Sequence, residues 1–505
     1  MMRRAGTFAR WARRIAFLLI ILAIAIPSTI ILVFAVQARV RHGDLRPWHR
    51  LALESEFRSG SAGAPRTFDE YRALEDRLIM EVHRRVMDSP AADRYALSRY
   101  TPGSVPARLA LDTPYNRSFE LVPETIRGGA LLVHGLSDSP YSMRALAELL
   151  RDHGYYVLAL RLPGHGTIPS GLLDVRWQDW YAAVELAAAH VAERAGQGRP
   201  FWVGGHSTGG ALTTLYCVRS LTDTSVPRPT RLVLVSPAIG ISKLAGLTRI
   251  VSGLAFLPYF EKSRWLDVLP EYDPYKYNSF PVNAATQIHL LTLELQRALD
   301  DEGAKAHLDA MPRVLAFQSL IDATVTTSEV LHGLFEKLPP RGHELVVFDI
   351  NRSEKLQDLL SPSLVQDLDQ VRAAAAFPFR LSWIGNRDPD SREVIAYTRE
   401  EGSRETLKSD LGLFWPPGIL SLGHVALPFP GDDPVYGIEP RGTDMPPYPL
   451  GALTVRGEAG ALVVPLGNLA RLRSNPFFPV MRDRVLAALE ADAPTVSRGI
   501  KEAIP

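Results

Sequence analysis

The sequence predicts an α/β fold with a mostly parallel central sheet and helices on both faces. Two observations carry this prediction. Short apolar runs alternate with helical segments between residues 118 and 350, and such a succession requires crossover helices on both sides of a parallel sheet. The most distinctive turns each follow a predicted strand, so we expect them to meet at the carboxyl edge of the sheet, where such folds bind ligands.

The composition is that of a globular protein and excludes some partners. The chain has 505 residues, of which 46% are hydrophobic and 22% charged. A net charge of +1 argues against nucleic acid as a partner, because no basic excess is available to follow phosphates. The lone cysteine, Cys217, cannot form an internal disulfide, and we expect it to be a small core residue.

The N-terminus predicts one transmembrane helix. Residues 1–14 carry five arginines and no acid, and residues 15–36 are 22 consecutive uncharged residues. This length spans a bilayer as a helix, and the basic start should stay in the cytoplasm. We therefore expect a single-pass membrane protein with its catalytic domain on the extracytoplasmic, periplasmic side. A cleaved signal peptide is the alternative, less favoured because the apolar run is longer than a signal core.

The remaining chain divides into a short appendage and one large domain. Residues 37–110 read as a linker and a helical appendage, whose helix starts at Thr67 with a capping-box pattern. Residues 111–495 form the α/β domain, with a cap insertion at about 238–311 and a second insertion at about 351–415 that contains a possible hairpin. The expected strands are 118–122, 129–133, 155–160, 201–206, 231–235, 313–317 and 344–350. The expected helices are 142–151, 179–194, 211–218, 326–338 and 478–490.

A strand, a sharp turn and a helix enclose Gly-x-Ser-x-Gly at residues 205–209. In a nucleophile elbow the strained turn exposes the serine hydroxyl, here that of Ser207. Gly205 and Gly209 suit this turn because strand and helix backbones approach closely there. A glycine-rich turn with an idle serine is the alternative interpretation.

A serine nucleophile needs a base and an orienting acid, and both have candidates later in the chain. Asp322 follows the strand 313–317, and Asp349, at the end of the next strand, is the second choice. His424 lies in a loop bounded by Gly and Pro beyond all these strands, so we expect it to be the base. The oxyanion would be held by two backbone amides, those of Thr208 and Leu136.

These motifs together resemble the α/β-hydrolase superfamily. The matching pieces are His134-Gly135-Leu136, Pro163-Gly164-His165-Gly166, Gly205-His206-Ser207-Thr208-Gly209 and the loops of Asp322 and His424. They are most similar to the monoacylglycerol lipase, carboxylesterase and serine aminopeptidase-like branch. Two features depart from it, namely the N-terminal anchor and the interval of 102 residues between Asp322 and His424.

The resemblance implies hydrolysis of a carboxylic ester through an acyl-enzyme, with a cap over an apolar pocket. The substrate would be a small-molecule or lipid-derived ester such as a monoacylglycerol, and neither a metal nor an organic cofactor would be required. The cap residues Phe256, Leu257, Tyr259 and Phe260 are candidates for lining an acyl channel. A serine peptidase or amidase, and a catalytically silent binding protein on the same fold, remain alternatives.

Overall fold

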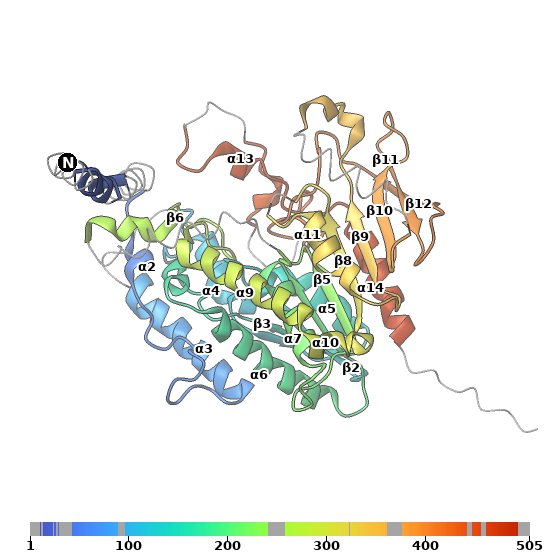
Figure 1. Cartoon of the computed structure of the whole chain (residues 1–505), viewed down its shortest axis with the longest axis horizontal. Helices are drawn as coiled ribbons and strands as arrows, with labels where there is room; N and C mark the ends of the chain where they lie inside the picture. Colours follow the sequence, from blue (N-terminus) through green and yellow to red (C-terminus); the bar gives the residue numbers. More distant parts are fainter. Residues whose placement is uncertain are drawn as a thin grey trace, which may run out of the picture.

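A ten-stranded sheet forms the centre of the molecule in the computed structural model (Figure 1). The strand order is β1-β3-β2-β4-β5-β8-β9-β10-β11-β12. The strands are β1 (Phe119–Leu121), β2 (Gly128–Val133), β3 (Tyr155–Leu160), β4 (Phe201–His206), β5 (Arg231–Val235), β8 (Arg313–Ser319), β9 (Glu344–Phe348), β10 (Arg380–Asn386), β11 (Glu393–Arg399) and β12 (Leu407–Phe414). The structure describes residues 11, 14–23, 25–26, 29, 43–88, 96–240, 258–322, 324–360, 376–441, 447–455 and 461–492.

The seven central strands, β3, β2, β4, β5, β8, β9 and β10 in sheet order, run parallel. At the two edges, β1, β11 and β12 pair antiparallel. Successive side chains of the central strands alternate between two separate apolar clusters. On β2, for example, Leu131 and Val133 join one cluster and Ala130 and Leu132 the other. Both faces of the sheet are therefore buried, as a parallel sheet requires.

Helices cover both faces of this sheet. One face carries α6 (Trp177–Ala195), α7 (Thr208–Arg219) and α9 (Val282–Asp300), which pack against one another (Figure 1). The opposite face is covered by α5 (Arg144–Asp152) and α14 (Phe478–Asp492), whose apolar residues belong to the second cluster. The other α-helices of the described residues are α2 (Pro47–Arg50), α3 (Phe68–Val82), α4 (Val105–Asp112), α10 (Glu302–Lys305), α11 (Thr327–Gly333) and α13 (Leu466–Leu469). The α/β fold with a mostly parallel sheet is thus confirmed.

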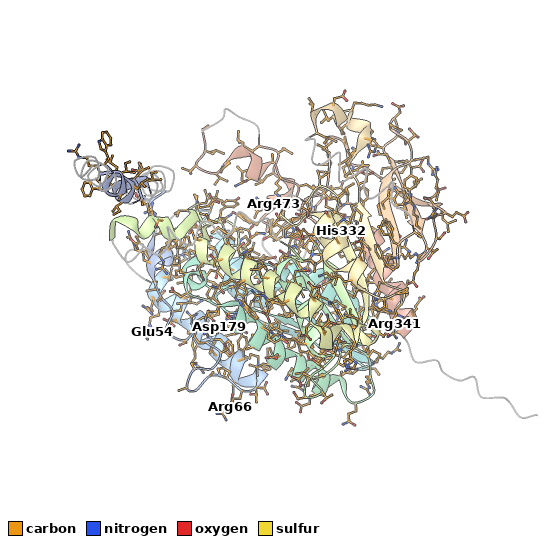
Figure 2. The ribbon with its side chains drawn as sticks, in the orientation of Figure 1. Glu54, Arg66, Asp179, His332, Arg341 and Arg473 are labelled. Atoms are coloured by element: carbon orange, nitrogen blue, oxygen red, sulfur yellow. The ribbon has the colours of Figure 1, made fainter. Side chains whose placement is uncertain are left out.

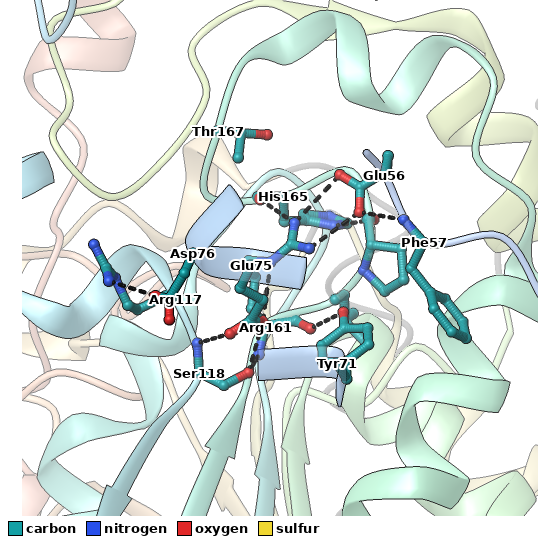
Figure 3. Close-up of polar contacts among 12 residues, drawn as sticks. Glu56, Phe57, Tyr71, Glu75, Asp76, Arg117, Ser118, Arg161, His165 and Thr167 are labelled. Atoms are coloured by element: carbon teal, nitrogen blue, oxygen red, sulfur yellow. Dashed lines mark hydrogen bonds and ion pairs between the residues drawn. The ribbon is translucent and has the colours of Figure 1, made fainter. Parts of the chain in front are cut away.

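The N-terminal appendage docks onto the domain through a buried ion cluster (Figure 3). Arg161, directly after β3, lies 3.0 Å from Glu56 and 3.1 Å from Glu75 of α3, and each of these side chains is at most 7% exposed. Ser118 also donates to Glu75, and the Tyr71 hydroxyl donates to the Arg161 carbonyl at 2.8 Å. The helix predicted from Thr67 is therefore built into the domain, with the Thr67 side chain accepting from the Glu70 amide at its start.

The expected membrane anchor is not supported by the structure. Residues 14–23 and 25–26 are helical, and their large apolar side chains are exposed, Ile15 by 52% and Phe17 by 64%. Within the described residues, no helix combines the length and the apolar character needed to span a bilayer. The other residues of the 15–36 segment, apart from Thr29, lie outside the described part of the chain.

Both predicted insertions contribute to the body of the domain. In the second, 351–415, β10 pairs parallel with β9 and continues the central sheet, so the expected hairpin of β10 and β11 is not separate from it. In the cap region, 238–311, α9 packs on α6 and α7, whereas residues 269–279 lie beside the loop after β2. Phe256 and Leu257 fall outside the described residues, and Tyr259 and Phe260 fall in the short helix Pro258–Arg264.

Candidate active site

Ser207 occupies the sharp turn between β4 and α7. Its backbone angles are φ 52° and ψ −114°, a conformation that costs free energy for any residue with a side chain. A Cβ on Gly205 would lie 2.2 Å from the Gly209 carbonyl carbon, and one on Gly209 would lie 2.0 Å from the Val133 oxygen. The two glycines therefore allow helix and strand to approach closely around the serine, as the sequence pattern predicts.

His424 and Asp322 form a buried hydrogen-bonded pair. The Nδ1 atom of His424 lies 2.7 Å from Oδ2 of Asp322, and the two residues are 6% and 4% exposed. Oδ1 of Asp322 accepts hydrogen bonds from the amides of Thr324 and Val325. With Nδ1 donating to the carboxylate, Nε2 of His424 is left as a proton acceptor. The structure thus brings together the acid and the base predicted from sequence.

The second candidate acid, Asp349, has other partners. Its carboxylate accepts from the Ile350 amide and lies 3.5 Å from the Arg352 guanidinium. No hydrogen bond between Asp349 and His424 is present among the described residues. Of the two candidate acids, Asp322 is thus the one that the described structure pairs with His424.

Burial sets the protonation of the pair. It lowers the pKa of His424, although the hydrogen bond to Asp322 acts in the opposite direction. Burial by itself would raise the pKa of Asp322, but the hydrogen bond from His424 and the two backbone amides lower it below its ordinary value. At neutral pH the pair is thus a carboxylate and a neutral imidazole, the state that a general base requires.

The long segment between Asp322 and His424 comes back to the end of the strand from which it departs. After β9 the chain adds β10 to β12 at the edge of the same sheet, and it then comes back beside the end of β9. There the Asn351 amide donates to the Leu420 carbonyl at 2.7 Å, and its side chain donates to the Ile419 carbonyl at 2.9 Å. Ser319, at the end of β8, donates to the Leu422 carbonyl at 2.8 Å. These anchors hold the loop in front of His424, and the sequence reasoning did not identify them because their partners are backbone atoms.

The loop after β2 lies directly against the serine turn. A Cβ on Gly135 would be 3.2 Å from the Ser207 Cβ and 3.0 Å from the His206 ring. Among the described residues, neither the Leu136 nor the Thr208 amide donates a hydrogen bond. The Ser207 hydroxyl makes none either in that part of the chain. In the described chain, three groups around the Ser207 turn therefore have no hydrogen-bond partner. They are the Leu136 amide, the Thr208 amide and the Ser207 hydroxyl.

His134 and His206 support this arrangement from behind. The His134 ring donates to the Gly135 carbonyl at 2.8 Å and accepts from the Leu162 amide at 3.0 Å. Only the neutral ring can do both, and burial lowers its pKa to about 4. The rings of His206 and His424 are tilted relative to each other, with their centroids 5.0 Å apart. The Nε2 atom of His206 lies 3.3 Å from the His424 carbonyl oxygen.

Cys217 belongs to the apolar core around α7. Cys217 is buried in α7, and burial raises the pKa of its thiol, so it is a core residue as expected. Within the described ranges, no three His, Cys, Asp or Glu side chains are grouped to hold a metal ion.

Comparison with known proteins gives the family. The family model described as "Alpha/beta hydrolase family" matches residues 130–433, more than half of the chain. A thermostable monoacylglycerol lipase of Bacillus sp. (strain H-257) is 33% identical over 173 residues. That alignment covers 34% of this chain and 64% of the relative, so the chain spans less than two thirds of the curated relative's length.

Two solved structures are also similar. One comes from work on LipS and LipT, two metagenome-derived lipolytic enzymes, and has 23% identity and a TM-score of 0.36 over 52% of this chain and 99% of that one. The other is the Paleococcus ferrophilus monoacylglycerol lipase, with 18% identity and a TM-score of 0.34 over 50% of this chain and 98% of that one. On the family match and the sheet described above, this chain belongs to the α/β hydrolase family.

Proposed function

We propose that this protein is a serine hydrolase that cleaves carboxylic esters, with a lipid-derived ester such as a monoacylglycerol as its substrate class. The observation that carries the proposal is the buried His424–Asp322 hydrogen bond of 2.7 Å, which belongs to the loops that surround the strained Ser207 turn. The 33% identity with a monoacylglycerol lipase supports the choice of ester.

In the proposed mechanism Ser207 attacks the acyl carbon while His424 takes the serine proton. His424 then protonates the departing alcohol, which leaves an acyl-enzyme that water hydrolyses by the same proton route. Asp322 keeps His424 in the tautomer with Nδ1 protonated. The serine–histidine hydrogen bond is expected to form when substrate binds, since such contacts often tighten only in the complex.

The oxyanion of the tetrahedral intermediate is proposed to lie between the Leu136 and Thr208 amides. The Thr208 amide is at the N-terminus of α7, where the helix dipole also favours negative charge. The His134 hydrogen bonds to Gly135 and Leu162 would hold the Leu136 amide in place before substrate arrives.

A fluorophosphonate probe and a series of p-nitrophenyl esters test the proposal. We expect the wild-type protein to be labelled and to hydrolyse esters, and Ser207→Ala to lose labelling and at least about 10⁴-fold in kcat. Cys217→Ala is the matched control, because it changes a buried residue of the adjoining helix with no role in the reaction. Absence of Ser207-dependent labelling would favour a silent binding protein, and turnover of aminoacyl amides but not of esters would favour a peptidase.

We also propose that residues 15–36 anchor the chain in a membrane, with the catalytic domain on the extracytoplasmic side. The proposal rests on the arginine-rich residues 1–14 beside 22 uncharged residues, and on the exposure of the apolar side chains described there. The protein should stay in the membrane pellet after alkaline extraction, and protease added to spheroplasts should cut the catalytic domain. Release into the extract or full protection from protease would refute the anchor or its orientation, respectively.

A further inference from the structure

A cavity of about 160 Å³ lies beside the loops that carry the proposed catalytic residues. Its wall includes Asp138 and His206 from the loops around Ser207, and Val425, which follows His424. The remaining wall comes from residues 269–278 of the cap region, from Phe429 and Tyr436, and from residues 468–473. The proposed nucleophile and the proposed base are therefore each next in sequence to a residue of the wall.

Three cationic side chains line this cavity, namely Lys276, Arg471 and Arg473. Figure 2 labels Arg473, which lies in the segment after α13 at the upper centre of the view. Arg473 is paired, with its guanidinium 3.4 Å from the Asp273 carboxylate and 3.3 Å from the Tyr272 hydroxyl. These two charges compensate each other.

The other two cations lack such a partner. In the described chain, neither the Lys276 ammonium nor the Arg471 guanidinium forms a hydrogen bond or an ion pair. Asp138, the second acid of the wall, has its carboxylate 3.6 Å from the His206 ring. Three basic side chains of the wall thus face two carboxylates, and Asp322, which lies outside the wall, also attracts the Arg471 guanidinium.

Arg471 also lies close to the reacting groups. A Cβ on Gly423, the residue before His424, would be 3.5 Å from the Arg471 guanidinium. A cation withdrawn from water is costly unless a counter-charge or hydrogen bonds compensate it. Lys276 and Arg471 feel Asp138 and Asp322 only at longer range, so both keep donors that could bind an anionic group of a ligand.

We propose that this cavity binds an anionic group of the substrate, a carboxylate or a phosphate, through Lys276 and Arg471. Ammonium and guanidinium groups are the side chains best suited to such oxyanions. The inference rests on the proposed ester hydrolysis and narrows its substrate class to esters that also carry an oxyanion. The same chemistry is present in a carboxylate at the far end of the acyl chain and in a phosphate on the alcohol.

Two matched pairs of substrates separate these sources. The first compares 4-nitrophenyl hydrogen glutarate with neutral 4-nitrophenyl valerate. The second compares a 1-acylglycerol 3-phosphate with the 1-monoacylglycerol of the same chain length. We expect the anionic member to have the higher kcat/KM in one pair, by about 10- to 100-fold, as for hydrogen bonds to charged groups. The favoured pair then shows which end of the ester enters the cavity.

Variants that remove the charge of Lys276 or Arg471 test whether the preference for anionic esters comes from the cavity. Lys276→Met and Arg471→Met should each lower the anionic-to-neutral ratio of kcat/KM by about 10-fold or more. Arg404→Met, on the exposed loop between β11 and β12 and far from the cavity in sequence, should leave the ratio unchanged. A wild-type preference for the neutral ester in both pairs, or ratios that survive in both variants, would overturn the proposal.

Binding without turnover separates this inference from the proposed hydrolysis. In the Ser207→Ala protein, glutarate or inorganic phosphate should raise the melting temperature, and Arg471→Met in that background should abolish the rise. No rise with either anion would overturn the anion site even if neutral esters are hydrolysed. A rise in a protein that hydrolyses no ester would refute the proposed function alone.

Discussion

Replacing Arg161 by Met should destabilise the protein far more than replacing an arginine of similar contacts at the surface. Arg161 is 1% exposed and lies within 3.1 Å of two buried carboxylates, those of Glu56 and Glu75. Its guanidinium also donates to the His165 carbonyl at 2.8 Å. Met fills a similar volume but leaves both carboxylates buried without their counter-charge. Breaking a buried pair from one side costs about 3–5 kcal/mol.

Figure 3 also contains the matched control, the ion pair of Arg117 and Asp76 at 2.9 Å. Their side chains are 33% and 55% exposed, so water screens the pair and Arg117→Met should cost at most about 1 kcal/mol. With an unfolding entropy of about 2.1 cal/mol/K per residue, about 400 ordered residues correspond to about 0.8 kcal/mol/K. Arg161→Met should therefore lower the melting temperature by about 4–6 °C and Arg117→Met by about 1 °C.

Thermal unfolding followed by circular dichroism, with urea titration as a second measure, checks these values. Adding Glu56→Gln and Glu75→Gln to Arg161→Met should recover much of the loss, because no buried charge is then left unpaired. Equal losses in Arg161→Met and Arg117→Met would refute the reasoning. So would a triple variant that is less stable than Arg161→Met, because the carboxylates would then not be the source of the cost.

Three further predictions concern the candidate active site. Asp322→Asn should lower kcat by about 10⁴-fold with an unchanged circular dichroism spectrum, and a loss below about 10-fold would exclude Asp322 as the orienting acid. Because burial lowers the pKa of His424 from 6.5 and the base must be neutral, the acid limb of the kcat/KM profile should have its midpoint below pH 6.5; a midpoint above it would contradict the assignment. Asn351→Leu removes the side-chain bond to the Ile419 carbonyl and should lower kcat/KM by about 10-fold while destabilising the fold by about 1–3 kcal/mol; unchanged steady-state kinetics would show that this anchor does not position His424.

The sequence predicted the elements whose information is local. The strands that precede Ser207 and Asp322 are continuous apolar runs, which is what burial on both faces requires. The turn at Ser207 needs two glycines at fixed positions, because Cβ atoms on Gly205 and Gly209 would meet backbone within 2.2 Å. Because only glycine satisfies this steric requirement, the turn can be recognised in the sequence from the spacing of its two glycines.

The elements that were misread depend on distant partners. The hairpin of β10 and β11 was recognisable, but its place in the central sheet is decided by β10 pairing with β9, which no local pattern encodes. β12 is mostly exposed, as an edge strand can be. α9 did have a local signal, since Ala284, Ile288, Leu291, Leu295 and Leu299 are buried at helical spacing. The cationic cavity wall combines segments about 200 residues apart, so only the folded chain brings it together.

The length of the segment between Asp322 and His424 matters less to the chemistry than where that segment begins and ends. Asn351 and Ser319 each hold the returning chain by a hydrogen bond to a backbone carbonyl, beside the ends of β9 and β8. Since loop closure costs only about 0.6 kcal/mol for each doubling of length, three added strands that pack into the two clusters of the sheet impose little penalty on the loop that carries His424. A later segment, residues 468–473, also lies beside this loop, and its Arg471 guanidinium is next to Gly423. The added strands can therefore leave the proposed triad unaltered, while the segment that follows them supplies part of the wall that would select the substrate.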